Sequence, residues 1–539
     1  MAKKKNKMKK KQWITLAIYI LSIILMMPGI FVMYLNAANK QFKGQITFGS
    51  NNHDYIFPQK PVHLSGKIVS NRDTIRLIVG FWRNYITGFG AEYETMKVSL
   101  DSLGRFDVTL PQIDHPFRIQ IGDAFSHNLL FNRNQIAEPG DSIFILGIIR
   151  DQDLPSDSNF TAVFTGKGSA KYQCIQALKK NPAPTMYHIP TTESKIEITD
   201  SLINAKLRTV SNFSKEINQD ILETMKADII GDCKFNLSLS IFSDIIYNKS
   251  IQPNVKATKK VIFDDIMQKD HIFISNDILS QSAGYTQYVY LKEKLRILFS
   301  LGRNQMTYKA LYENIKSLYD GKLKDKLLAY CSLNTIDLVE FFEGSDPDEF
   351  RDCLEDAANN IKVPWLNEPV KKLLSTRAKG APAFNFSLPL DSSSRRINLE
   401  DLKGNVVLVD MWGYICTSCY RFAQAFHEKV YPEFQNNKNF KVISIMLDPY
   451  ADRDKYLQRL RMENGPAYTF NTYINLYGGK NEQIAREIEK YYNINVAPFI
   501  ILIDKKGRIY STTIPFFTEK NSPNIEKLSA LIRKALAES

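Results

Sequence analysis

The chain opens with a lysine-rich segment that is followed by a long stretch without charge. Seven lysines lie within residues 1–12, and the 23 residues from Trp13 to Leu35 carry no charged side chain. A helix of that length extends about 35 Å, enough to cross a bilayer core of about 30 Å. Lysines keep their end of such a span in the cytoplasm. The sequence therefore predicts a single-pass anchor over 13–38 in the inner membrane, with the bulk of the chain facing the periplasm.

A cleaved secretory signal is the alternative interpretation of this segment. Leu35-Asn36-Ala37 or Asn36-Ala37-Ala38 could serve as a small-residue cleavage site, although the apolar run exceeds the ~7 to 15 residues of most signals. Cleavage would release the protein into the periplasm. Both interpretations place everything after residue 38 outside the cytoplasm.

The net charge does not point to nucleic acid. The formal charge of the whole chain is +13, but it falls to +6 without the seven lysines of the first segment. The remaining charge is modest for a chain of this length, so we expect no nucleic-acid partner.

A polar linker is expected at 39–61, and short alternating apolar runs follow it. Val62, Leu64 and Ile68 alternate with polar residues, as do Phe106 and Val108. Alternation places such side chains on one face of a strand, and 101–104 (Asp-Ser-Leu-Gly) is expected to form a hairpin turn between two strands. Six to eight strands without intervening helices predict a small antiparallel β-sandwich.

The apolar spacing then becomes helical. One series recurs at intervals of three and four, which predicts one face of an amphipathic helix: Ile203, Leu207, Val210, Phe213, Ile217 and Ile221. Similar spacing recurs between about 308 and 359. We expect a mostly helical middle region.

The last part of the chain alternates strands with helices. Apolar runs predict strands at 406–411, 440–447, 499–504 and 508–513, with a helix after the first, and Ser522-Pro523 is expected to cap a final helix. The expected organisation is a basic cytoplasmic segment at 1–12, an anchor at 13–38, a linker at 39–61, a β-sandwich at 62–165, a helical region at 166–375 and an α/β domain at 376–539.

The α/β domain contains a pair of cysteines where its first strand ends and its first helix begins. Cys416 and Cys419 are separated by two residues. A cysteine at a helix N-terminus meets unpaired N–H groups and the positive end of the helix dipole, which stabilise its thiolate. One turn along, the second thiol can reach back and close a disulfide. Cys416 is therefore the expected attacking thiolate and Cys419 the resolving thiol.

At this point the chain resembles the thioredoxin-like superfamily, and within it the exported TlpA/ResA-like reductases of the AhpC/TSA type. The resemblance covers about 379–536 and rests on five ordered matches: 380–384 (Gly-Ala-Pro-Ala-Phe), 398–404 (Asn-Leu-Glu-Asp-Leu-Lys-Gly), 409–412 (Val-Asp-Met-Trp), the cysteine pair, and 496–499 (Val-Ala-Pro-Phe). A looser likeness links 140–142 and 164–168 to the N-terminal segments that accompany such domains in Bacteroidetes-type bacteria.

The resemblance implies roles for further residues. Pro498 matches the family's cis-proline, which implies that it lies against the cysteine pair and turns the Ala497 backbone toward an extended substrate. Asp410 matches a buried acid that takes the proton from Cys419; a solvated carboxylate at a strand end is the alternative. Trp412 is expected to pack beneath the site and to belong with Ala497 and Pro498 to the substrate-binding set. The segment 473–480 and the helix after it resemble an insertion of exported relatives.

The expected function is thiol-disulfide exchange with protein disulfide or dithiol substrates, supported by a membrane thiol electron donor and by bilayer contact through 13–38. Thr417-Ser418 and Ile415 depart from the family pattern, so reductant, oxidant and isomerase all stay open. A binding protein that uses the domain for recognition is one alternative. A thiol peroxidase is another, but Gly413 stands where its threonine is expected.

We expect no cofactor and no metal. Tyr420 follows Cys419 where a c-type haem site needs histidine, and the histidines are scattered, with His427 expected at the surface. The other cysteines are Cys174, Cys233, Cys331 and Cys353. They could form two structural disulfides in any of three pairings or remain isolated buried thiols.

Overall fold

The computed structural model describes a large part of the 539-residue chain, all of it within one compact unit, 54–539. The described residues are 60–70, 76–82, 94–123, 129–149, 160–179, 191–247, 259–260, 263–264, 276–302, 306–334, 345–390, 395–414, 416–448, 454, 469–479, 483–494, 496–517, 522 and 524–538. The predicted anchor at 13–38 lies outside them. Among the helices that are described, none is both long and apolar enough to span a membrane.

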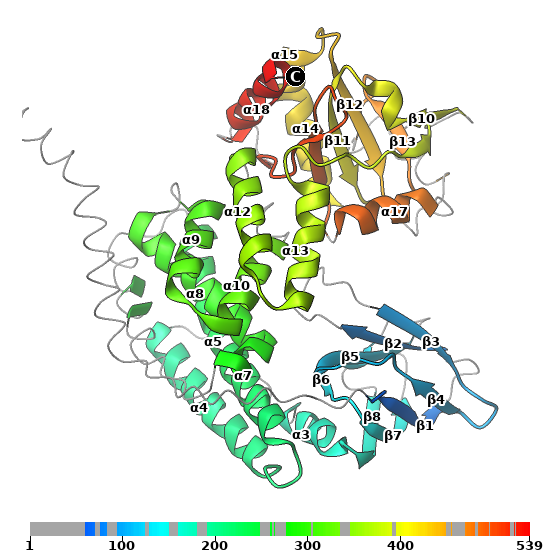
Figure 1. Cartoon of the computed structure of the whole chain (residues 1–539), viewed down its shortest axis with the longest axis vertical. Helices are drawn as coiled ribbons and strands as arrows, with labels where there is room; N and C mark the ends of the chain where they lie inside the picture. Colours follow the sequence, from blue (N-terminus) through cyan, green and yellow to red (C-terminus); the bar gives the residue numbers. More distant parts are fainter. Residues whose placement is uncertain are drawn as a thin grey trace, which may run out of the picture. The chain divides into compact units, whose positions relative to one another are not determined.

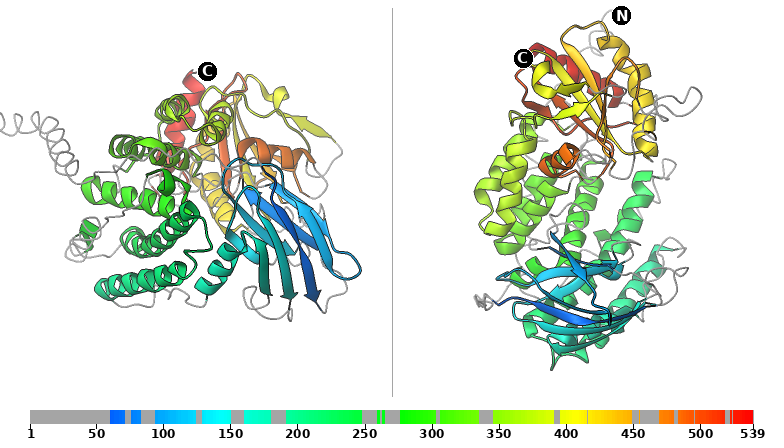
Figure 2. Two further views of the ribbon diagram at one scale, coloured as in Figure 1. Left: turned by 60° about the horizontal axis from the view of Figure 1, so that its bottom comes forward. Right: turned by 90° about the vertical axis from the view of Figure 1, so that its right-hand side faces the viewer.

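Eight strands form two four-stranded sheets that share one hydrophobic core (Figures 1 and 2). Their orders are β4-β1-β7-β8 and β3-β2-β5-β6. Alternate side chains of both sheets, such as Leu64, Val79 and Ile119, are fully buried between them. The strands are β1 His63–Ser70, β2 Arg76–Trp82, β3 Glu94–Ser99, β4 Arg105–Thr109, β5 Phe117–Asp123, β6 Leu129–Ala137, β7 Ser142–Ile149 and β8 Phe160–Lys167.

Two expectations about these sheets are wrong in detail. The sandwich is not wholly antiparallel, because β1 pairs in parallel with β7 along its whole length, from His63 beside Ser142 onward. The turn at 101–104 is present, with Gly104 at a φ of +74°, but it is no hairpin. It connects β3 in one sheet to β4 in the other, because β3 pairs with β2 while β4 pairs with β1.

The middle region is helical, and most of its helices bury apolar faces in one large core. The helices are α3 Ser169–Lys179, α4 Thr192–Ser211, α5 Gln219–Tyr247, α7 Asn276–Gln281, α8 Ala283–Leu301, α9 Tyr308–Leu318, α10 Gly321–Leu333, α12 Pro347–Asn360 and α13 Pro364–Arg377.

The single helix expected over 203–221 is in fact two. α4 ends at Ser211, and the Asn218 side chain accepts the backbone N–H of Asp220 to start α5. Val210, Ile217 and Ile221 nevertheless pack into the same core. The periodic pattern therefore reports a shared buried face and not a continuous helix.

The last part of the chain is a five-stranded sheet of order β13-β12-β11-β14-β15 with helices on both faces (Figure 1). The central strand β11 is buried along its whole length. α14 and α18 pack on one face, and α17 packs on the other. The elements are β9 Ser387–Pro389, β10 Arg396–Asn398, the 3-10 helix η3 Leu399–Leu402, β11 Val406–Trp412, α14 Thr417–Lys429, α15 Tyr431–Phe434, β12 Phe440–Met446, β13 Ile474–Tyr477, α17 Gln483–Tyr492, β14 Phe499–Ile503, β15 Ile509–Ser511 and α18 Asn524–Glu538.

One strand of this sheet falls within the segment expected as an insertion, 473–480. β13 pairs in parallel with β12 and forms an edge of the sheet. Only four residues long, it is too short for an alternating or apolar run to reveal it from sequence.

Arg377, the last residue of α13, packs against this sheet. Its side chain is 2% exposed, and its guanidinium carbon lies 4.5 Å from the centroid of the Phe499 ring. Thr512 Oγ1 donates a hydrogen bond to its backbone oxygen at 3.1 Å. Burial lowers the pKa of Arg377 to about 9. The final turn of the helical region thus forms part of the core around β14.

Candidate active site

The cysteine pair lies at the N-terminus of α14, as the sequence predicts. Cys416 and Cys419 form a disulfide with an S–S distance of 1.97 Å. Cys416 is the N-cap residue of α14, and its sulfur accepts the backbone N–H of Cys419 at 3.1 Å. Free N–H groups and the helix dipole therefore converge on the Cys416 sulfur, where they stabilise a thiolate after reduction.

The two cysteines differ in access. Cys416 is partly exposed, whereas Cys419 is 1% exposed and packs with Trp412, Met446 and Tyr477. A disulfide or thiolate from solvent can therefore reach Cys416 but not Cys419. Of the two sulfurs, only that of Cys416 has the access that the expected attacking thiol requires.

A loop far along the chain lies against the pair. The Ala497–Pro498 bond is cis, as the resemblance implies. Ala497 O lies 3.5 Å from Cys416 Sγ, and Ala497 is exposed while Pro498 is buried. The loop thus presents backbone beside the reactive sulfur, where an extended peptide could pair with it.

Asp410 lies on β11, beneath the start of α14, and its environment disfavours charge. The residue is 6% exposed, and no hydrogen bond within the described residues reaches its Oδ1. Burial raises the pKa of Asp410 to about 7. The alternative of a solvated carboxylate is therefore wrong. No described hydrogen bond joins Asp410 to either cysteine.

Trp412 supports the site from inside and does not meet the substrate. Its side chain is 1% exposed, and its Nε1 donates to Ser444 Oγ at 2.8 Å. A residue enclosed in this way has no surface for a substrate, so its inclusion in the substrate-binding set is wrong. Its expected packing beneath the site is confirmed by its contact with Cys419.

Two polar residues near the site were missed from the sequence. Ser444 accepts the Trp412 hydrogen bond, and Asp448 Oδ2 accepts the backbone N–H of Tyr414 at 3.2 Å. Ser444 lies beside Asp410 in the parallel register of β11 and β12. A serine in the middle of an otherwise apolar strand was the available signal.

His427 is not a free surface residue. It is partly buried on α14, its ring stacks on Phe470 with centroids 3.5 Å apart, and its Nδ1 lies 3.0 Å from Tyr473 OH. Burial by these rings removes water from the imidazole, and this desolvation lowers the pKa of His427. His427 thus connects α14 to a cluster of aromatic rings that includes Phe470 and Tyr473.

The other four cysteines are free thiols, and all are buried: Cys174, Cys233, Cys331 and Cys353. Burial raises the pKa of Cys174 and of Cys353 to about 12, and that of Cys233 to about 11. Of the two sequence alternatives, isolated buried thiols are confirmed.

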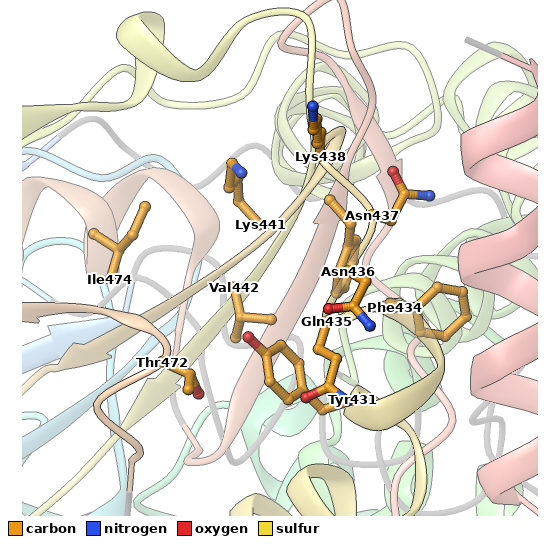
Figure 3. Close-up of a pocket in the computed structure, with 11 residues that line it drawn as sticks. Tyr431, Phe434, Gln435, Asn436, Asn437, Lys438, Lys441, Val442, Thr472 and Ile474 are labelled. Atoms are coloured by element: carbon orange, nitrogen blue, oxygen red, sulfur yellow. The ribbon is translucent and has the colours of Figure 1, made fainter.

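A surface cavity of about 280 Å³ lies elsewhere on the domain (Figure 3). Its lining includes Tyr431, Lys438, Lys441 and Thr472. Lys438 and Lys441 flank the start of β12, whereas the cysteines follow the end of the parallel strand β11. The cavity is therefore at the opposite end of the sheet and takes no part in the cysteine site.

Part of the chain matches a known protein family. Residues 404–509 match the family model described as thioredoxin-like, and no curated protein matches the chain. Among solved structures, the thioredoxin domain of a thiol-disulfide oxidoreductase from Bacteroides vulgatus is 20% identical, with 29% of this chain and 96% of that chain covered at a TM-score of 0.23. A thioredoxin-like protein from Bacteroides caccae is 16% identical, with 60% and 97% covered at 0.31. A thiol:disulfide interchange protein from a Bacteroides species is 21% identical, with 25% and 80% covered at 0.21.

The family match contains the central strand, the cysteine pair and the cis-proline loop. These are also the elements that the structure brings together at one end of the sheet. The part of the chain that matches the thioredoxin-like family is therefore the part that carries the candidate site, residues 404–509.

Proposed function

We propose that this protein is a membrane-anchored thiol-disulfide oxidoreductase that exchanges disulfides with protein substrates outside the cytoplasm. The observation that carries the proposal is the Cys416–Cys419 disulfide at the start of α14 with Ala497 O 3.5 Å from its exposed sulfur. The expected anchor at 13–38 supplies the location, and its flanking lysines set the orientation.

The exchange proceeds in two balanced steps. The Cys416 thiolate attacks one sulfur of a substrate disulfide, forming a mixed disulfide and releasing the other substrate sulfur as a thiolate. Cys419 then loses its proton and attacks Cys416, which releases the second substrate thiol. Two electrons pass to the substrate, and the Cys416–Cys419 disulfide re-forms. A membrane dithiol donor returns the pair to its reduced state.

Asp410 is the proposed proton acceptor for the second step. Cys419 is buried, so its thiol needs an acceptor within the protein. With a pKa of about 7, the Asp410 carboxylate holds a proton far more readily than an ordinary aspartate. That property suits transfer from a thiol near neutral pH.

Insulin reduction by the full chain tests the proposal. We expect Cys416→Ser and Cys419→Ser each to lower the rate by at least about 100-fold, while Cys174→Ser, which changes a buried thiol outside the site, stays within about twofold. Equal rates in all four proteins would overturn the proposal.

A trapping experiment separates exchange from simple recognition. In Cys419→Ser the mixed disulfide cannot be resolved, so substrate should accumulate on Cys416 and be released by dithiothreitol. Substrate that co-purifies with Cys416→Ser,Cys419→Ser to the same extent would indicate a binding protein.

A further inference from the structure

The outward side of the sheet β4-β1-β7-β8 carries a cluster of exposed apolar side chains. We call this cluster the outer apolar face. Its members are Val69 (45% exposed), Phe144 (45%), Leu146 (40%), Ile148 (41%) and Val163 (56%). Among the described residues only one other large apolar side chain is exposed to this degree, Leu103 in the turn before β4.

The strand register makes the cluster continuous. Leu146 lies opposite Val163 of β8, and Ile148 lies opposite Val69 of β1. Phe144 is two residues from Leu146 on the same face of β7. In an ordinary solvated sheet these outward positions are polar. Here β7 is apolar on both faces, although only one of them contacts the sandwich core.

The size of the outer apolar face favours one peptide segment as its occupant. Three strands about 4.8 Å apart span about 10 Å, and 144–148 of β7 extend about 13 Å. Such a patch offers a few hundred Å² at most, whereas each side of a standard interface between folded proteins buries about 800 Å². Two or three apolar side chains of a single segment would fill it.

The occupant binds by side chains and not by adding a strand. β8 is the edge strand next to the cluster, but two side chains of α3 bond to its backbone. Gln173 Nε2 donates to Phe164 O and Gln176 Nε2 to Ala162 O, both at 2.8 Å. The carbonyl groups that an added strand would need are therefore already used.

A positive charge at the border of the outer apolar face favours an occupant with an acidic residue. Lys67 is exposed and lies opposite Leu146 on β1. Its charge acts on Asp101, but it forms no salt bridge within 4 Å among the described residues. An acidic side chain next to the apolar residues of the occupant would pair with it.

We propose that the outer apolar face binds apolar, acid-flanked segments of incompletely folded substrates whose disulfides the cysteine pair exchanges. The inference rests on the proposed function. Cysteine and its neighbours in a folded core are among the most buried residues, so a chain that has not folded exposes its cysteines within apolar segments. A face that holds such segments keeps them on the same molecule as Cys416.

The test uses the full chain in phosphatidylcholine nanodiscs and a fluorescein-labelled twelve-residue peptide with a Val-Leu-Phe-rich centre and Asp at both ends. The variant carries Phe144→Thr, Leu146→Thr and Val163→Thr, since threonine suits exposed strand positions. Thr161→Ser, on the same face of β8, is the matched control. We expect the Kd from anisotropy to rise about tenfold in the triple variant and to stay unchanged in the control. Replacing Asp by Lys in the peptide should also weaken binding.

Cys416→Ser makes the two proposals separable, because it should bind the peptide with unchanged Kd while it cannot exchange disulfides. A disulfide-linked form of the peptide gives the kinetic readout. In the triple variant the ratio of its KM to that of glutathione disulfide should rise about tenfold.

Three results would overturn the inference. The first is an unchanged Kd in a folded triple variant. The second is sedimentation that shows a dimer in the parent and a monomer in the triple variant, which would assign the face to a second copy. The third is hydrogen exchange in β7 that slows in phosphatidylglycerol nanodiscs relative to phosphatidylcholine, which would assign it to the lipid surface.

Discussion

The cysteines of the C-terminal domain and those of the helical region differ in their position along a helix. Cys416 caps the start of α14, where its sulfur accepts a backbone N–H. Cys174 and Cys353 lie inside α3 and α12, and their side chains are buried in apolar cores. The same thiol group meets the N-terminal end of a helix in one place and is buried in an apolar core in the other.

This contrast teaches that position along a helix decides what a cysteine does in this chain. Six cysteines could all have served as structural bridges. Instead four are small apolar residues of the cores, and the pair that forms a disulfide is the one next to solvent.

The largest expected effect is in alkylation of the reduced native protein by iodoacetamide. At pH 7.5 a thiol with a pKa of about 12, such as Cys353, is almost wholly protonated and is also shielded. Cys416 should therefore react at least ~1,000-fold faster than any of the four buried thiols. Mass spectrometry of labelled peptides measures the rates, and unfolding in guanidinium chloride should make all six react alike. Comparable labelling of Cys353 and Cys416 in the native state would break the comparison.

The next effect concerns Asp410, the buried acid on β11 near the cysteine pair. Its folded-state pKa of about 7 is above that of an unfolded aspartate, so the native state binds the proton more tightly. Stability should therefore fall as pH rises from about 4 to about 7, by on the order of 4 kcal/mol.

Asp410→Asn should remove this pH dependence and lower the rate of insulin reduction about tenfold near pH 7. Urea unfolding at pH 4 and pH 8 measures the first expectation, with Asp448→Asn as the control in a nearby carboxyl. A parent protein that becomes more stable across this range would contradict the assignment.

The smallest effect distinguishes the two regions by stability. Cys353→Ser places a hydroxyl in an apolar core and should lower the free energy of unfolding by roughly 1–3 kcal/mol. Cys416→Ser, in the reduced protein, should change it by less than about 0.5 kcal/mol because the residue is partly exposed. Urea denaturation under reducing conditions measures both. A larger loss for Cys416→Ser would mean that the pair also supports the fold.

Local patterns predicted the reactive region better than the rest. β11, α14 and the cysteines are consecutive in sequence, so one apolar run and one spacing located them together. The role of Pro498 was predicted from the resemblance to a family. No local pattern indicates that the preceding residue, Ala497, has its backbone oxygen 3.5 Å from Cys416 Sγ. Trp412 was placed correctly beneath the site, but its exposure depends on packing that the sequence does not state.

Long-range pairing explains most of the errors. Nothing local in β1 tells whether its neighbour β7 runs parallel or antiparallel. The turn at 101–104 has ordinary hairpin residues, yet its two strands belong to different sheets. The division between α4 and α5 was hidden because residues on both sides of it share one core.

Arg377 has a practical consequence for dissecting the molecule. The sequence changes character at about residue 378, which is where one would cut to isolate the redox domain. Such a cut removes the cation that covers Phe499 next to the cis-proline, the acceptor for Thr512, and Asp348, to which Lys379 donates at 2.8 Å. An excised domain that keeps these three contacts must begin no later than the start of α12.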